Sequence, residues 1–178
     1  MFKMADDAVE TYHGLPSPLT SIAASSWASG RVFAKAGENN FIQLELGFPN
    51  SGSFNVTVNL ADGTYTTGGT SPQPGRATVT PCKNGGALSE ISARAGTAAA
   101  QTVRLSVLNH NGTTTTYAGT AGNGVYIQYP QLELSPRSTS TIVTENGPAT
   151  RDADNYSFPL PEGYDSRDMS FCVEAVPG

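Results

Sequence analysis

This sequence has little charge of either sign and no excess of positive charge. Asp, Glu, Lys and Arg make up only 14% of the 178 residues, and 15 acidic against 10 basic side chains give a formal net charge of −5 at pH 7. Domains that bind nucleic acids or anionic membrane surfaces usually carry a clear basic excess. We therefore expect no nucleic-acid partner and no attachment to an anionic membrane.

Long apolar runs and cysteines are also scarce. No window approaches the roughly 18 apolar residues of a membrane-spanning helix, and the first residues do not resemble a secretory signal. We therefore expect neither membrane insertion nor an export signal. Cys82 and Cys172 could form a disulfide bond, although unpaired thiols are the commoner state in a protein assembled in a reducing cytoplasm.

The motifs of common catalytic sites are missing too. There is no G-x-S-x-G, H-E-x-x-H or glycine-rich phosphate loop, and we expect His13 and His110 on the surface or in turns. Glu45 and Glu133 could serve as the paired carboxylates of a glycoside hydrolase, but exposed acids on any two strands give the same pattern. We expect no catalytic residue and no enzymatic activity.

A metal site has little support in the sequence. Residues 152–155 (DADN) place oxygen-bearing side chains in succession, as calcium loops do, but the glycine and the distal glutamate of an EF-hand loop are missing. We expect no metal and no other cofactor, with calcium as the one alternative.

Turn-forming and β-branched residues, in contrast, are abundant. The 19 glycines and 12 prolines, together with many threonines, serines and asparagines, favour short strands joined by tight turns. The chain length suits one domain with a sizeable core, and no helix of ordinary length is expected. We therefore predict an all-β fold of roughly eight or nine strands.

The alternation of apolar and polar residues locates the strands. We predict strands at residues 31–36, 41–46, 54–60, 64–67, 76–80, 87–95, 102–109, 113–118 and 125–134. Hairpin turns are expected at residues 37–40, 61–63 and 109–112, and an exposed loop at residues 68–75. The predicted core contains Trp27, Val32, Ile42, Leu44, Leu46, Val56, Val58, Leu105, Val107 and Ile127.

The long strand near residue 125 closes the predicted domain. Val125, Ile127 and Tyr129 alternate along it, and the run that follows is rich in Ser, Thr and Pro, with too few apolar residues to pack into a core. We therefore predict a β-sandwich at residues 1–134 and an extended exit segment with a C-terminal strand at residues 135–178, acting as a linker or an assembly tail.

Several short motifs resemble those of a known family. The strand end Gln131-Leu132-Glu133 precedes STIVT at residues 140–144 and ATRDAD at residues 149–154, and residues 31–44 read RVFAKAGENNFIQL. Together these motifs resemble a jelly-roll module common in virion proteins of tailed phages and prophages. Residues 1–19 are expected to be irregular and to lack the first strand of that family, so the chain is either a fragment or has a different start.

The resemblance carries implications for fold, partners and location. It implies a jelly roll of two antiparallel sheets in a tail fibre, tail spike or head fibre. It also implies other virion proteins as partners, a homo-oligomer that is often a trimer, and a place in the virion after assembly in the host cytoplasm.

Aromatic and amide side chains on the predicted strands suggest a ligand. Sugars stack on aromatic rings beside planar polar groups, so we predict a glycan site from five residues, with Tyr129 and Gln131 supplying further groups. The five are Tyr65, Tyr117, Tyr126, Gln128 and Gln43. The alternative is that the tyrosines serve only in packing, which is the commoner role of such side chains on strands.

Three functions are compatible with these features. The first is a non-enzymatic virion structural protein that contacts host-surface polysaccharide. The second is a carbohydrate-binding module of a secreted polysaccharide-degrading enzyme, which shares the fold and predicts a monomer with an exposed aromatic strip. The third, a phage depolymerase, needs two acids close together in a groove. We expect the first.

Overall fold

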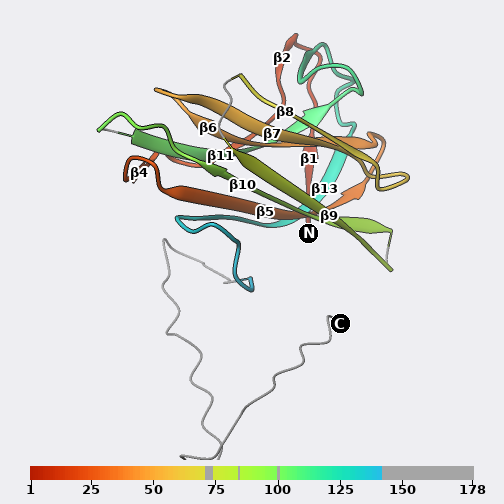
Figure 1. Cartoon of the computed structure of the whole chain (residues 1–178). Helices are drawn as coiled ribbons and strands as arrows, with labels where there is room; N and C mark the ends of the chain where they lie inside the picture. The colour runs from red at the N-terminus through yellow and green to blue at the C-terminus, as the bar shows by residue number, and fades with distance from the viewer. Residues whose placement is uncertain (71–73, 84, 100, 142–178) are drawn as a thin grey trace, which may run out of the picture. The chain divides into compact units, whose positions relative to one another are not determined.

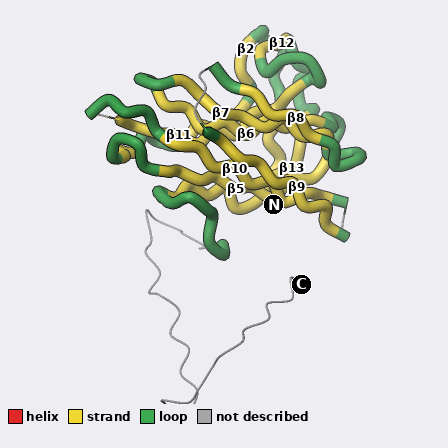
Figure 2. The backbone as a smooth tube through the Cα atoms, viewed as in Figure 1, coloured by secondary structure: helices red, strands yellow, loops and turns green. Residues whose placement is uncertain are grey.

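The computed structural model describes residues 1–70, 74–83, 85–99 and 101–141, and all of these belong to one compact unit. They form strands, turns and loops without any helix, as Figure 2 shows. Within this part of the chain there is accordingly no helix with the length and apolar character needed to cross a membrane. The predicted all-β fold is confirmed.

Two antiparallel sheets pack face to face as a β-sandwich (Figure 1). The first, which we call the five-stranded sheet, has the order β1 (Phe2–Ala5), β13 (Gly124–Glu133), β5 (Trp27–Ala36), β10 (Gly86–Arg94) and β9 (Gly75–Cys82). The second, the six-stranded sheet, has the order β3 (Gly14–Pro16), β11 (Gln101–His110), β6 (Phe41–Phe48), β7 (Gly52–Asn59) and β8 (Tyr65–Gly68), and β4 (Thr20–Ile22) also pairs with β11. A separate pair joins β2 (Thr11–Tyr12) to β12 (Thr116–Tyr117). The sandwich is established, and its finer assignment to the jelly-roll class stays a prediction.

The core lies between the inner faces of the two sheets. Apolar residues alternate with polar ones along β6 and β5, so each strand presents one apolar face to the other sheet. The predicted core residues found buried are Val32, Ile42, Leu44, Leu46, Val56, Val58, Leu105, Val107 and Ile127. These confirmed positions follow directly from the two-residue period of a strand.

Trp27 is the exception, because it does not belong to the core. It is only partly buried, at the start of β5. Val32 and Ala28 face inward on this strand, so Trp27 has the outward parity, and the guanidinium carbon of Arg76 lies 5.5 Å from the centroid of its ring. The predicted core position of Trp27 is therefore wrong, because strand parity turns its side chain away from the core.

Two of the predicted hairpins are wrong. Residues 37–40 connect β5 to β6, which lie in different sheets, so this polar loop crosses the sandwich. The backbone amide of Asn39 donates to the carbonyl of Gly124 at 3.1 Å and thereby ties the loop to β13. After β11, the chain turns at residues 111–114, but the next strand, β12, pairs with β2. Turn-forming residues predict where the chain reverses. They do not predict which strand the next strand pairs with, because that depends on the whole fold.

The turn at residues 61–63 does form a hairpin, because Val58 of β7 pairs with Tyr65 of β8.

The expectation of an irregular start is wrong. Residues 2–5 form β1 and pair with β13, and β2 and β3 follow before residue 17. The short length of these strands hides them from periodicity arguments.

A buried carboxylate fixes one end of the sandwich. Asp6 follows β1 and is only 6% exposed. Its Oδ1 accepts from the side-chain amide of Asn109 at 2.6 Å, and its Oδ2 accepts from that of Asn39 at 2.9 Å. The hydroxyl of Tyr117 lies 2.9 and 3.0 Å from the two oxygens. Asp6 therefore joins the N-terminal strand to β11, β12 and the loop between the sheets.

Both histidines are buried, contrary to the expectation of surface or turn positions, and His13 lies beside this cluster. His13 is 4% exposed, and its ring packs edge-on against Tyr117 with centroids 5.0 Å apart. His110 is 8% exposed, and its Nδ1 accepts from the backbone amide of Gly112 at 2.9 Å. Burial lowers the pKa of His110 below its usual value of 6.5, because a charged imidazole loses hydration there.

We expect Asp6→Asn to lower the free energy of unfolding by about 2–3 kcal/mol, because the new NH2 group faces the amide donors of Asn39 or Asn109 and leaves a buried donor unpaired. Chemical denaturation measures this change. Asp7→Asn is the matched control, since the Asp7 side chain is 62% exposed, and it should change stability by less than about 0.5 kcal/mol. Equal effects of the two substitutions would contradict the role of Asp6.

His110 should make stability depend on pH. Above pH 6.5 the histidine is neutral in both states, and below it the unfolded chain takes up a proton before the folded chain does. The free energy of unfolding should therefore fall as the pH drops from 6.5 toward the lowered folded pKa of His110. His110→Asn keeps an acceptor for Gly112 and removes the titration, so it should flatten this part of the curve. A variant as pH-sensitive as the original protein would contradict the assignment.

Candidate functional site

The structure does not gather the five predicted glycan residues in one place. Tyr126 and Gln128 lie on β13 in the five-stranded sheet. Gln43 and Tyr65 belong to β6 and β8 in the six-stranded sheet, where Gln43 accepts a hydrogen bond from Thr57 at 3.3 Å. The predicted site therefore divides between the two sheets.

Tyr117 has a structural environment. Its hydroxyl bonds to Asp6, and its ring packs on His13. Burial first, and the hydrogen bond to the Asp6 carboxylate second, raise the pKa of Tyr117 far above its usual value of 10.0. This tyrosine stabilises the end of the sandwich, so the packing alternative fits it better than the glycan prediction.

The outer face of the five-stranded sheet collects several side chains that suit a ligand. Gln128 pairs with Phe33, and Phe33 pairs with Leu88. Residues directly opposite one another in antiparallel strands project from the same face. An amide, an aromatic ring and an aliphatic side chain therefore stand side by side across three strands.

A pocket of about 340 Å³ opens on this face, and we call it the aromatic pocket. It is lined by Arg31, Phe33, Cys82, Leu88, Gln128, Tyr129 and Thr141. The mixture of two rings with an amide and a guanidinium is typical of sites that bind sugars.

The backbone of Tyr129 is strained at this pocket. The register of β13 against β5 shifts between Gln128 and Gln131, which marks a β-bulge, and Tyr129 has a φ of 52°. A left-handed conformation costs a non-glycine residue about 1–2 kcal/mol. Bulges change the direction of a side chain, and here the side chain is a ring that is 47% exposed and lines the pocket. Strain that exposes a large ring is a typical feature of a binding site.

The chain that leaves β13 lies on the same face. Arg31 donates to the carbonyl of Thr139, and the backbone amide of Thr139 donates to Glu133 at 2.7 Å. Residues 135–141 are thereby held against the sheet. The predicted C-terminal strand, Cys172 and the calcium alternative at residues 152–155 lie outside the described residues.

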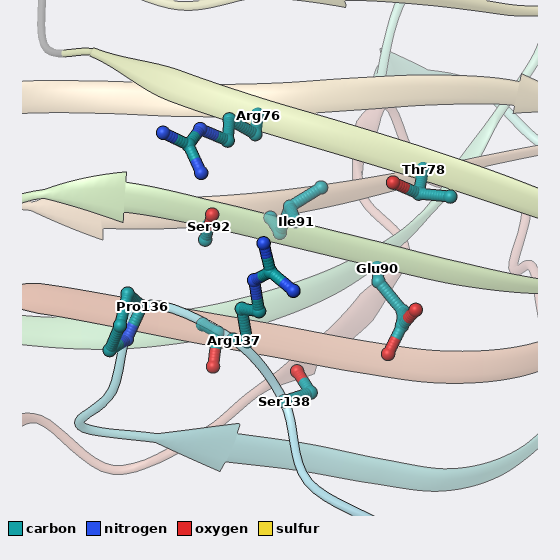
Figure 3. A pocket seen from close by; sticks show the side chains of 9 residues that line it. Arg76, Thr78, Glu90, Ile91, Ser92, Pro136, Arg137 and Ser138 are labelled. Atoms are coloured by element: carbon teal, nitrogen blue, oxygen red, sulfur yellow. The ribbon is translucent and has the colours of Figure 1, made fainter. Parts of the chain in front are cut away.

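These exit residues cover one side of a second pocket, which has a volume of about 400 Å³ and which we call the arginine pocket. It is lined by Ser29, Arg76, Thr78, Glu90, Ile91, Ser92, Pro136, Arg137 and Ser138. Figure 3 shows the guanidinium groups of Arg76 and Arg137 extending into the space between β9, β10 and the exit segment. The two pockets lie along the same strand, β5, which contributes Ser29 to one and Phe33 to the other.

A third pocket, of about 380 Å³, lies on the outer face of the six-stranded sheet. Tyr12, Glu45 and Arg104 are among its lining residues. Its lining includes one guanidinium group and one exposed ring but no residue with a strained backbone. The outer face of the five-stranded sheet is therefore the better candidate for a ligand-binding site.

The carboxylates considered for glycoside hydrolysis do not meet. Glu45 lies on β6 and Glu133 on β13, which belong to different sheets. The carboxylate of Glu133 accepts hydrogen bonds from Gln131 and Thr139 at 2.7 Å each, and the second of these bonds helps to hold the exit segment on the sheet. Among the described residues no group of three or more His, Cys, Asp or Glu side chains is placed to hold a metal ion.

Phe33, Leu88 and Arg31 were not among the predicted site residues, although the sequence holds a signal for two of them. Arg31 and Phe33 alternate with Val32 and Ala34, which predicts an outward-facing ring beside an outward-facing guanidinium. The approach of Leu88 from β10 depends on strand order, which has no local signal.

No protein-family model matches the chain, and no curated protein matches its sequence.

We expect Tyr129→Asn to raise the free energy of unfolding by about 0.5–1 kcal/mol, because asparagine tolerates a positive φ better than tyrosine does. Chemical denaturation measures the effect. Tyr126→Asn is the control on the same strand, and it should be destabilising, because it removes a ring that lies 5.9 Å from the Lys3 ammonium. A loss of stability in the Tyr129 variant would show that its ring contributes more to the fold than its backbone strain costs.

Proposed function

We propose that this protein is a non-enzymatic structural component of a phage virion that contacts host-surface glycan through the outer face of the five-stranded sheet. The observation that carries the glycan contact is the aromatic pocket, whose lining includes the exposed ring of Tyr129 on a strained backbone. A structural module of this kind needs a rigid scaffold and an exposed recognition surface, and it needs no covalent chemistry.

The aromatic pocket offers each type of contact that a sugar ring needs. The rings of Phe33 and Tyr129 present surfaces on which the C–H face of a sugar stacks. Gln128 supplies an amide donor and acceptor for hydroxyl groups, and Arg31 adds donors. The sheet holds these groups without a ligand, so little conformational entropy is lost when a glycan binds.

The virion assignment is supported by the motif resemblance at residues 31–44 and 131–133. The chain passes back and forth between the two sheets, since β1, β5, β10 and β13 belong to one sheet and β3, β6, β7 and β11 to the other. This exchange between sheets supports a jelly-roll fold, which the motif resemblance implies. A homo-oligomer, such as a trimer, would present several aromatic pockets at once, and many copies on a virion make weak glycan contacts effective through avidity.

A carbohydrate-binding module of a secreted polysaccharide-degrading enzyme is the second candidate. The same aromatic pocket favours it, because such a module also binds glycan on a sheet face. The two candidates differ in assembly, since a free-standing module is expected to be a monomer and a virion component a homo-oligomer.

The test combines glycan-array binding with light scattering on the purified full-length chain. We expect glycan binding that falls about tenfold in Tyr129→Asn, the substitution that removes the ring and relieves the strain, and a solution mass that is a multiple of 18.5 kDa. Loss of the stacking ring is the physical reason for the weaker binding.

Tyr65→Asn is the control for this experiment. Tyr65 is 46% exposed, nearly as much as Tyr129, but it lies in the six-stranded sheet. It should bind glycan as the original protein does. Binding that depends on Tyr65 and not on Tyr129 would move the site to the other sheet, and a monomer that still binds would favour the second candidate.

A further inference from the structure

Positive charge gathers on one side of this acidic protein. Among the described residues, every lysine and arginine except Arg104 lies on the outer face of the five-stranded sheet or at its rim. These cationic residues are Lys3, Arg31, Lys35, Arg76, Lys83, Arg94 and Arg137. The formal net charge of −5 does not reveal this clustering, because it is a sum over the whole sequence.

Few acidic groups oppose these cations. Glu38 at the rim lies 2.6 Å from the Lys3 ammonium, and Glu133 is engaged by Gln131 and Thr139. Glu90 is the remaining acid on this face, since it pairs in register with Arg31. The face therefore has more positive groups than negative ones, and it attracts anions.

The arginine pocket is the part of this face that is best suited to hold an anion. Within the described residues, no hydrogen bond or ion pair engages the guanidinium of Arg76 or Arg137. Arg76 does lie over the ring of Trp27, a contact that orients the planar group and leaves its N–H donors available. The hydroxyl oxygen of Ser138 is buried in the pocket wall and has no hydrogen-bond partner in the described part of the chain. The pocket therefore holds two guanidinium groups and one hydroxyl that lack an acceptor partner in the described part of the chain, and the carboxylate of Glu90 lines the same pocket without forming an ion pair with either arginine there.

We infer that the arginine pocket binds the carboxylate of an acidic polysaccharide whose neighbouring sugars occupy the aromatic pocket. This inference rests on the proposed glycan contact and adds the chemical class of the glycan. Guanidinium groups bind carboxylates through paired, charge-assisted hydrogen bonds, which makes arginine selective for a planar anion. The two pockets are close enough for one chain, since Ser29 and Phe33 are four residues apart on β5, about 13 Å at 3.3 Å per residue.

A polysaccharide fits this face better than a nucleic acid. The sugar–phosphate backbone of a DNA strand has no hydroxyl group that could donate to the carboxylate of Glu90, which lines the arginine pocket beside the two arginines. A carboxylated sugar carries its charge at one substituent and has hydroxyl groups around it. Those hydroxyls can donate to Glu90 while the carboxylate accepts from the arginines.

The test measures binding of the full-length protein to two forms of one polymer. Polygalacturonate carries a carboxylate on every sugar, and its methyl ester has the same backbone with the charge removed. We expect calorimetry to show at least about tenfold tighter binding of polygalacturonate, and this preference should weaken as salt increases.

Arg137→Gln should reduce the affinity for polygalacturonate about tenfold and leave the affinity for the methyl ester unchanged. Arg104→Gln on the six-stranded sheet is the matched control, and it should leave both affinities unchanged. Thermal unfolding of both variants establishes that they are folded. We expect Arg137→Gln to fold normally, because Arg137 is exposed and lies outside the strands.

The outcomes separate this inference from the proposed function. Equal affinity for the two polymers, with the loss in Tyr129→Asn intact, overturns the acidic-glycan inference and leaves the glycan contact standing. No binding of either polymer and no signal on a glycan array overturns both. Tighter binding to a single-stranded DNA oligonucleotide than to polygalacturonate would also overturn the inference, and would identify the basic face as a nucleic-acid surface.

Discussion

The buried carboxylate of Asp6 is the interaction on which this end of the molecule depends. A carboxylate that is almost fully removed from water is stable only when hydrogen-bond donors surround it. Here the donors come from Asn39, Asn109 and Tyr117, which belong to three separate parts of the chain. By satisfying them, Asp6 holds β1 in place beside β13, and β13 is the strand that presents Gln128 and Tyr129.

The division between inner and outer faces places core residues and candidate site residues on the same strands. Inward residues of β5 such as Val32 are fully buried, while Arg31 and Phe33, one position away on each side, stand on the outer face. The core and the candidate site therefore share the same strands. The bulge at Tyr129 interrupts the alternation along β13, in a place where the fold holds an exposed ring at a cost in backbone strain.

Part of the candidate site was accessible from the sequence. The alternation of apolar and polar residues predicts one strand that carries both Gln128 and Tyr129, and the outward parity of Phe33 follows from the same rule. The sequence could not predict that Gln43 and Tyr65 lie in a different sheet from Gln128, because no local pattern assigns a strand to a sheet. The clustering of positive charge was hidden for a related reason: net charge is a sum over the chain, and only strand order shows which side chains share a surface.

The all-β class, most strand positions and nine buried core residues could be predicted from the amino-acid sequence, because the two-residue period of a strand and the chemistry of turns are local properties. Three features could be seen only in the folded chain: residues 37–40 cross between the sheets, β12 pairs with β2, and Arg76 and Arg137 line one pocket. Those outcomes depend on which strands become neighbours. That choice minimises the free energy of the whole chain, so no short segment contains it.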